Sequence, residues 1–170
     1  MDLSINCLNL VPYENLPKKE EIKDAPIDNL SKLYNIFLRM EEICKSLKGV
    51  GLAAPQLGLP YNMFICMDNY SQKYNYYVNA EIIYYGPEKG QSLEGCLSIR
   101  SENGRLRHFQ VERSKIIYIK CLKLNVDEEL ELEVIKKLEL KGLDSIVFQH
   151  EMDHCLGLSV LDKGEEFFIY

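Results

Sequence analysis

The sequence has no basic cluster and little excess of positive charge anywhere. Its 20 lysine and arginine residues are outnumbered by 26 aspartate and glutamate residues, which gives a formal net charge of −6. This balance argues against direct recognition of nucleic acid. No stretch approaches the ~18 consecutive apolar residues of a membrane span. The first residues also lack the basic region and apolar core of a secretory signal, so we expect a cytoplasmic protein that does not bind membranes.

The sequence also lacks paired cysteines and internal repeats. Its six cysteines are widely scattered, and none forms a C-x-x-C pair. A disulfide framework is therefore not expected, and free thiols fit a reducing compartment. Several of the six lie within apolar runs, as Cys66 does, where a buried thiol behaves as a small apolar side chain.

The length and composition are those of an ordinary globular domain. Of the 170 residues, 46% are hydrophobic and 27% are charged. We expect one domain over residues 1–170. An irregular arm over 1–28 precedes a helix over 29–48, whose apolar residues recur at spacings of three and four. Asp28 is the expected N-cap of this helix, and Gly49 is the glycine expected to end it.

Strands and a second helix make up the rest. Runs rich in aromatic and β-branched residues predict strands over 63–67, 74–85, 107–111, 115–124 and around 130–134. The second helix is expected over 143–155, where Leu143, Ile146 and Val147 begin an apolar stripe and Gly157 follows the last turn. The order predicts an α+β fold: short, mostly antiparallel strands around a buried C-terminal helix, with one N-terminal helix.

The second helix carries the pattern with the clearest chemistry. His150 and His154 lie four residues apart, and Glu151 directly follows the first. On a helix the two imidazoles share one face and can bind one metal ion. Glu151 lies about a quarter-turn away and can reach a water coordinated to that ion. This H-E-x-x-H pattern is typical of metal-assisted hydrolysis, although it also arises by chance in helices with hydrogen-bonded core histidines. Two ligands are too few, since a catalytic site normally has three and an open position.

Three segments, taken together, resemble a known family. Residues 49–56 (GVGLAAPQ), 94–98 (EGCLS) and 149–154 (QHEMDH) occur in this order. They resemble the three signature motifs of peptide deformylases, which remove the N-formyl group from nascent chains that begin with formyl-methionine. The resemblance implies a hydrolase that releases formate from N-formylmethionyl peptides. It also implies a location in the cytoplasm of a bacterium or of a phage-infected host, or in an organelle after removal of a transit segment.

The resemblance supplies the missing metal ligand. It implies that Cys96 joins His150 and His154 around one divalent ion. In the family this ion is typically Fe(II), and Zn(II) or Ni(II) can occupy the same site. A coordinating cysteine is deprotonated, and such an ion lowers the pKa of a coordinated water from ~15.7 towards ~7.

The resemblance also assigns the groups that act on the substrate. Glu151 matches the catalytic acid and base, while the Gln56 amide and the backbone N–H of Leu97 match the donors to the oxyanion. Arg100 stands where the family usually has a proline, so we expect a reshaped loop over 100–105.

The substrate pocket is expected beside these groups. The small residues of 49–54 are expected to crowd the formyl end and so exclude larger acyl groups. Gly51 and Gly95 are expected to lie along the substrate backbone. Val50 and Ile146 are expected to line the pocket for the methionine side chain. Asp153, Glu94 and Arg113 are candidates for an ion-paired group that orients the metal ligands, with separate surface charges as the alternative.

Two other functions stay open at this point. A zinc endopeptidase would need a third ligand such as His108, Glu165 or Glu166. A non-catalytic, metal-stabilised module that binds peptides or the ribosome is the second, although such a module has no need of Glu151 and Gln56. We expect a monomer whose partners are N-formylmethionyl nascent peptides, with a local contact to the ribosome left open.

Overall fold

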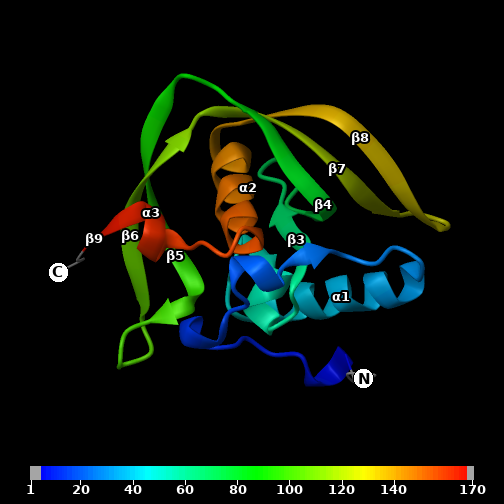
Figure 1. Ribbon diagram of the computed structural model, residues 1–170, viewed down its shortest axis with the longest axis horizontal. Helices are drawn as coiled ribbons and strands as arrows, with labels where there is room; N and C mark the ends of the chain where they lie inside the picture. The colour runs from blue at the N-terminus through cyan, green and yellow to red at the C-terminus, as the bar shows by residue number, and fades with distance from the viewer. Residues whose placement is uncertain (1–4, 168–170) are drawn as a thin grey trace.

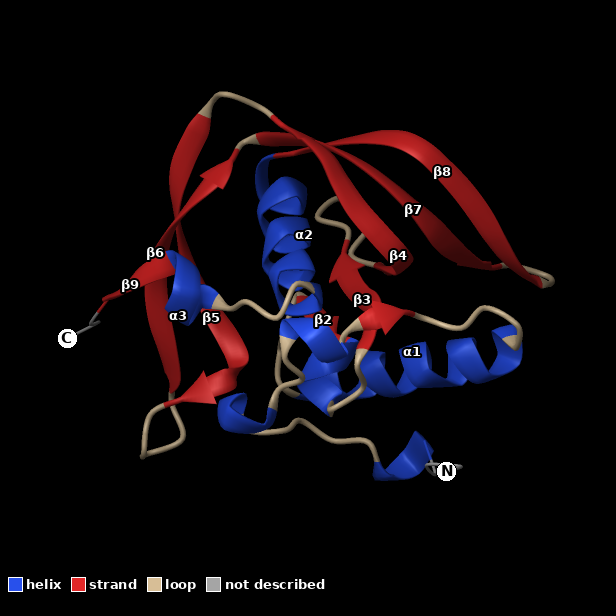
Figure 2. Ribbon diagram, in the orientation of Figure 1, coloured by secondary structure: helices blue, strands red, loops and turns tan. Residues whose placement is uncertain are grey.

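The computed structural model describes residues 5–167 and is a mixed α+β structure with more strand than helix (Figure 1). Residues 1–4 and 168–170 of the expected domain lie outside the described residues. The helices are α1 (Leu30–Ser46), α2 (Gly142–Cys155) and the short α3 (Val160–Lys163). Figure 2 shows α2 standing between two groups of strands, with α1 on the side away from the C-terminus.

The larger sheet has the strand order β1-β3-β4-β7-β8, and β2 pairs with β3 off this path. Its members are β1 (Lys23–Asp24), β2 (Gly51–Ala53), β3 (Tyr61–Met67), β4 (Tyr74–Tyr85), β7 (Ile116–Val126) and β8 (Leu130–Lys141). All of these pairs are antiparallel except the parallel pair of β1 with β3. The prediction of mostly antiparallel strands is therefore confirmed.

The smaller sheet has the order β5-β6-β9 and is also antiparallel. Its strands are β5 (Lys89–Arg100), β6 (Leu106–Ser114) and β9 (Gly164–Phe167). The expectation of short strands was wrong, because β4, β5 and β8 each contain 12 residues. Irregularities in the pairing of β4 with β7 and of β7 with β8 let these long strands bend around the helices.

Helix α1 agrees with the expected helix over 29–48 apart from its two ends. Its N-cap is Asn29 and not Asp28, because the Asn29 side chain accepts a hydrogen bond from the Lys32 N–H at 2.8 Å. At the other end, Lys48 and not Gly49 adopts the left-handed conformation, with φ of 56°. The Gly49 N–H donates to the Cys44 carbonyl and the Lys48 N–H to the Lys45 carbonyl. This is the Schellman arrangement, usually built on glycine.

Helix α2 is buried on most of its surface. Phe148 and Met152 pack into the core with residues of the larger sheet, while Leu143 at the N-terminal end is 49% exposed. The expected core-facing stripe is therefore wrong at Leu143. The buried polar side chain of Gln149 is satisfied, since it accepts from the Ser114 N–H and donates to the Ser114 carbonyl. Polar residues thus fix α2 against the end of β6.

The N-terminal arm consists of short 3-10 helices and β1, in agreement with the irregular segment expected over 1–28. The arm packs against the turn that follows α2. An added Cβ at Gly157 of this turn would lie 2.6 Å from the Lys19 backbone nitrogen. Cys7 on the arm is exposed, whereas the other five cysteines are buried, and all six are free. Between residues 5 and 167, no helix is both long and apolar enough to cross a membrane.

Candidate metal and hydrolytic site

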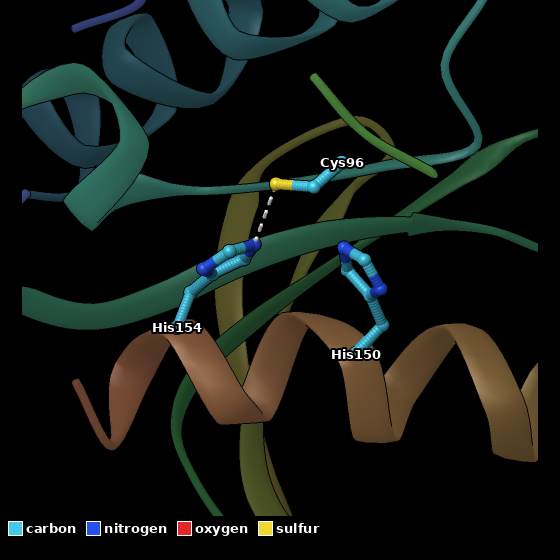
Figure 3. Close-up of side chains that lie close together, drawn as sticks. All are labelled: Cys96, His150 and His154. Atoms are coloured by element: carbon cyan, nitrogen blue, oxygen red, sulfur yellow. Dashed lines mark hydrogen bonds between the residues drawn. The ribbon is translucent and has the colours of Figure 1, made fainter. Parts of the chain in front are cut away.

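Three side chains from two elements converge at the centre of the molecule. His150 and His154 project from one face of α2 toward Cys96, which comes from β5 (Figure 3). One ligand atom of each residue lies within 4.8 Å of the others, and Cys96 Sγ is 3.3 Å from His154 Nε2. Bonds from zinc to sulfur and to imidazole nitrogen are about 2.3 and 2.0–2.1 Å, so the three atoms are close enough to bind one ion.

A buried ion-paired group lies behind the histidines. Arg113 of β6 donates to both carboxylate oxygens of Glu94 at 2.8 Å and to Asp153 at 2.6 Å. Glu94 also lies 2.8 Å from Nδ1 of His150. The candidates Glu94, Arg113 and Asp153 are therefore joined, and the alternative of separate surface charges is wrong.

The ion-paired group keeps Glu94 charged and orients the His150 ring. Burial opposes the charged form of Glu94, but hydrogen bonds from Arg113 and His150 outweigh it and lower the pKa of Glu94 to about 2. The contact with Glu94 turns the Nε2 side of the His150 ring toward the other donors, as an outer partner of a metal-bound histidine does. The imidazole is thus held in one orientation by a permanent carboxylate.

Glu151 lies at the edge of the three-residue group, inside the protein. It is 4% exposed, and its Oε2 has no hydrogen-bond partner among residues 5–167. Burial raises the pKa of Glu151 to about 7, a value suited to proton exchange near neutral pH. The carboxylate lies against Gly51, where an added Cβ would come 2.4 Å from Oε1. The missing side chain of Gly51 makes room for Glu151, and the expected place of Gly51 along the substrate backbone stays a prediction.

The two expected oxyanion donors lie on either side of Cys96. Gln56 accepts a hydrogen bond from the Ala53 N–H at 2.9 Å, and this fixes its amide so that Nε2 faces Cys96 Sγ at 3.4 Å and Ser98 Oγ at 3.3 Å. The pairing of β5 with β6 is interrupted between Gly95 and Arg100. Leu97 therefore lies outside the regular ladder of β5 with β6.

A pocket of about 280 Å³ opens onto these residues. Its lining includes all four residues expected to contact the substrate, namely Val50, Gly51, Gly95 and Ile146. Gln56, Leu97, His150 and Glu151 also line it, whereas Cys96 and His154 lie beneath its surface.

Sequence reasoning missed several residues of the pocket wall. These are Leu47, Lys48, Ser92, Leu93, Leu106, His108, Leu143 and Val147. The alternation of Leu93 with Gly95 and Leu97 was the available signal for a strand edge here. It was obscured because the alternation is inverted here: the polar Glu94 is buried, whereas the apolar Leu93 beside it is 54% exposed.

None of the third ligands proposed for an endopeptidase belongs to the cluster of Cys96, His150 and His154. His108 lies opposite Gly95 on β6 and lines the pocket, and Glu166 pairs with Arg107 at 2.6 Å. Among the residues that the structure describes, Cys96, His150 and His154 form the one cluster suited to a metal ion.

Comparisons with known proteins agree with this geometry. The family model for polypeptide deformylase matches residues 9–167. The peptide deformylase of Natranaerobius thermophilus is 32% identical over 160 residues, covering 89% of this chain and 94% of the relative. The crystal structure of the Thermotoga maritima peptide deformylase superposes with a TM-score of 0.72 at 30% identity, covering 93% of this chain and 97% of that one. A Synechococcus elongatus peptide deformylase in complex with actinonin superposes with a TM-score of 0.75 at 25% identity, covering 97% and 82%.

The family match spans most of the sequence, and both its ends lie beyond the three segments that meet at the pocket. On these grounds the chain belongs to the polypeptide deformylase family.

Proposed function

We propose that residues 1–170 form one catalytic domain in which Cys96, His150 and His154 hold a single divalent metal ion. The reaction is that of the family: removal of the N-formyl group from the formyl-methionine of nascent polypeptides, with release of formate. The observation that carries the proposal is the convergence of the three donor atoms within 4.8 Å.

The donor set fits such an ion chemically. One thiolate and two imidazoles leave a position open for a reactant, as in catalytic sites. Fe(II) is the native ion in this proposal, and Zn(II) or Ni(II) can replace it, because imidazole and thiolate ligands suit all three. When bound by Cys96, His150 and His154, the ion would act as a Lewis acid and would lower the pKa of a water molecule towards 7.

Glu151 moves the proton. Its carboxylate is buried beside the pocket, and its Oε2 is free of other partners among the described residues. It accepts the proton that water loses on attacking the formyl carbon, and then donates it to the amine of the departing methionine. Burial raises the pKa of Glu151, which favours a carboxyl group that both accepts and releases a proton.

Gln56 and Leu97 stabilise the negative charge that develops on the formyl oxygen. The Gln56 amide is fixed by its bond with Ala53, and the Leu97 N–H lies outside the sheet ladder. Donors held in place before the reaction need no reorganisation during it, and loss of one typically costs ~10²–10³ in rate.

The pocket accepts the peptide. Val50 and Ile146 contact the methionine side chain, and Gly51 and Gly95 let the peptide backbone approach the wall. An apolar pocket distinguishes side chains that differ by one methylene by only ~1–3 kcal/mol, so related apolar residues are tolerated. Actinonin, the compound bound in the Synechococcus elongatus complex, is expected to bind here and to compete with substrate.

The decisive experiment follows formate release from formyl-Met-Ala-Ser by protein purified anaerobically, with metal content measured on the same samples. Wild-type protein is expected to contain one ion per chain and to release formate. Glu151→Gln is expected to keep the ion and lose turnover, whereas Cys96→Ser is expected to lose both. Near wild-type turnover by Glu151→Gln would overturn the assignment.

The same experiment separates the other functions. A longer formylated peptide should lose formate without internal cleavage, and internal cleavage would support an endopeptidase. A metal-dependent increase in Tm without any formate release would support a non-catalytic module.

The setting of the reaction is also part of the proposal. We expect a monomer in the cytoplasm, or in an organelle after removal of a transit segment, that meets nascent chains near the ribosome. The net charge of −6 favours local contact over broad binding of ribosomal RNA. Sedimentation with and without ribosomes tests both the monomer and the contact.

A further inference from the structure

One wall of the pocket is an irregular segment, residues 49–51, between the end of α1 and β2. All three of its residues line the pocket. Behind the segment lie two side chains that do not line the pocket themselves, Tyr74 of β4 and Cys44 of α1. The wall is thus supported by two elements that none of the three sequence motifs includes.

Both side chains bind the backbone of the wall. The Tyr74 hydroxyl donates to the Gly49 carbonyl at 2.7 Å, and the Cys44 thiol donates to the Gly51 carbonyl at 3.4 Å. The same hydroxyl lies 3.4 Å from Cys44 Sγ, so the two supports touch each other. Cys44 is fully buried, and burial raises the pKa of its thiol to about 12. The thiol therefore keeps the proton that it donates.

The wall has little freedom between these supports and the reacting groups. A Cβ at Gly49 would lie 2.8 Å from Cys44 Sγ and 2.9 Å from Leu97 Cδ1. Two residues further along the wall, a Cβ at Gly51 would lie 2.4 Å from Glu151 Oε1. A shift of the wall therefore changes the width of the pocket, because all three of its residues line it.

The chain enters the wall through Lys48, which has φ of 56°. A left-handed conformation is unfavourable for a residue with a Cβ. Such a conformation persists where neighbouring contacts hold it in place. The Gly49 N–H contributes to this by donating to the Cys44 carbonyl at 2.8 Å, next to the two side-chain bonds.

We infer that Tyr74 and Cys44 form a clamp that sets the position of residues 49–51 and thereby the fit of the peptide substrate. Both are positioning residues, because they act through the wall and touch neither substrate nor metal ligand. The expected change in KM rests on the proposed function. The expected change in the mobility of the wall rests only on the contacts described above.

The test compares two tyrosines that face α1. Tyr74→Phe removes one hydroxyl that binds the wall. Tyr76→Phe removes a hydroxyl that binds Glu41 of α1 at 2.5 Å and has no contact with the wall. Both variants keep an aromatic ring, so they differ mainly in the bond that is lost.

With formyl-Met-Ala-Ser as substrate, Tyr74→Phe is expected to raise KM about fivefold with little change in kcat, equivalent to about 1 kcal/mol for one neutral hydrogen bond. Tyr76→Phe is expected to leave KM unchanged. Cys44→Ala should also raise KM, and the Tyr74→Phe/Cys44→Ala double variant should raise it by less than the product of the two single effects. An unchanged KM in Tyr74→Phe, or an equal rise in Tyr76→Phe, would overturn the clamp.

Amide hydrogen exchange tests the clamp independently of turnover. Peptides covering residues 47–53 are expected to exchange faster in Tyr74→Phe than in wild type, and at the wild-type rate in Tyr76→Phe. If wild-type protein releases no formate, the proposed function fails and the exchange rates alone decide on the clamp. Equal exchange in the two variants would then overturn it.

Discussion

At the scale of single residues, Gly51 connects the substrate wall with the proposed acid and base. Only a hydrogen atom fits at the Cβ position of this residue. An added Cβ would lie 2.4, 2.8 and 2.9 Å from three atoms of the Glu151 side chain. Glu151 has a second oxygen without a partner among the described residues and is enclosed by the protein. A methyl group here must displace Glu151 from its place beside the pocket.

Gly51→Ala is therefore expected to bind metal normally and to lose ~10² or more in kcat, the usual contribution of a positioned acid and base. Metal content and formate release, measured together, check this. Gly90→Ala on β5 is the control, because a Cβ there would meet only the flexible end of Lys115 at 3.4 Å. Unchanged kcat in Gly51→Ala would mean that Glu151 can do its work from another position.

The sequence predicted the reacting groups better than the groups that hold them. His150 and His154 follow from helical spacing, and Cys96, Gln56 and Leu97 from the resemblance to deformylases. Tyr74 and Cys44 are 30 positions apart, and their contact arises only when β4 passes beside α1. No local sequence pattern predicts the contact between Tyr74 and Cys44, so the clamp could be recognised only in the structure.

At the scale of elements, the two long helices end in the same motif with different residues. Gly157 takes the left-handed position after α2, with φ of 71°, and Lys48 takes it after α1. In both, the next N–H donates back across the turn, from Leu158 to the Asp153 carbonyl and from Gly49 to the Cys44 carbonyl. The sequence indicated glycine in both places, but the glycine after α1 is one residue too late.

Lys48→Gly is expected to raise the free energy of unfolding by about 1 kcal/mol, since it relieves the left-handed strain. For a chain of this size that corresponds to roughly 2–4 °C in Tm. Thermal unfolding checks it, with Lys45→Gly inside the last turn of α1 as a control of opposite sign, because glycine weakens a helix interior. A lower Tm in Lys48→Gly would show that contacts of the lysine side chain stabilise the fold by more than the left-handed backbone conformation destabilises it.

Arg113 joins three elements, since it lies on β6 and binds Glu94 of β5 and Asp153 of α2. All three side chains are less than 10% exposed. Arg113→Met is expected to destabilise the protein by ~3–5 kcal/mol, because it leaves two carboxylates buried without their partner. Metal affinity should also fall ~10–100-fold, since the partner of His150 is disturbed.

Chemical denaturation and metal titration check these two effects. The control is Arg107→Met on the same strand, which breaks the pair with Glu166. That pair is about 30% exposed on both sides, so its loss should cost no more than ~1 kcal/mol. Equal losses in the two variants would contradict a special role for the buried group.

Strand β5 shows why part of the fold could not be predicted. It carries Gly90, Gly95 and the buried Glu94, and each of these disfavours a strand when the sequence is considered locally. Glu94 is buried only because Arg113 neutralises it, and Gly95 lines the pocket opposite His108 of the neighbouring strand. These compensations come from other parts of the chain.

At the scale of the whole molecule, the proposed ion joins the two sheets. Cys96 belongs to the smaller sheet, while α2, with both histidines, packs against β2 and β3 of the larger one. A bound ligand stabilises the folded state by about 2.7 kcal/mol when its concentration is 100 times Kd. Metal binding is therefore linked to the stability of the entire fold.

Removal of the ion with a chelator is expected to lower Tm by roughly 5–10 °C, and return of Zn(II) or Ni(II) should restore it. Calorimetry with and without metal checks this. Cys96→Ser should show the lower Tm under both conditions. A wild-type Tm that does not respond to metal would contradict an ion placed between the sheets.

The unequal exposure of the six thiols has a practical consequence. Cys7 is open to reagents, while Cys44 and Cys121 are buried and their pKa values are raised to about 12 and about 11. Because the thiolate is the reactive form, alkylation at neutral pH should modify Cys7 within the first minutes and reach Cys44 or Cys121 only when α1 or β7 opens. The order in which the cysteines are alkylated, measured by mass spectrometry, should therefore report the order in which parts of the protein unfold.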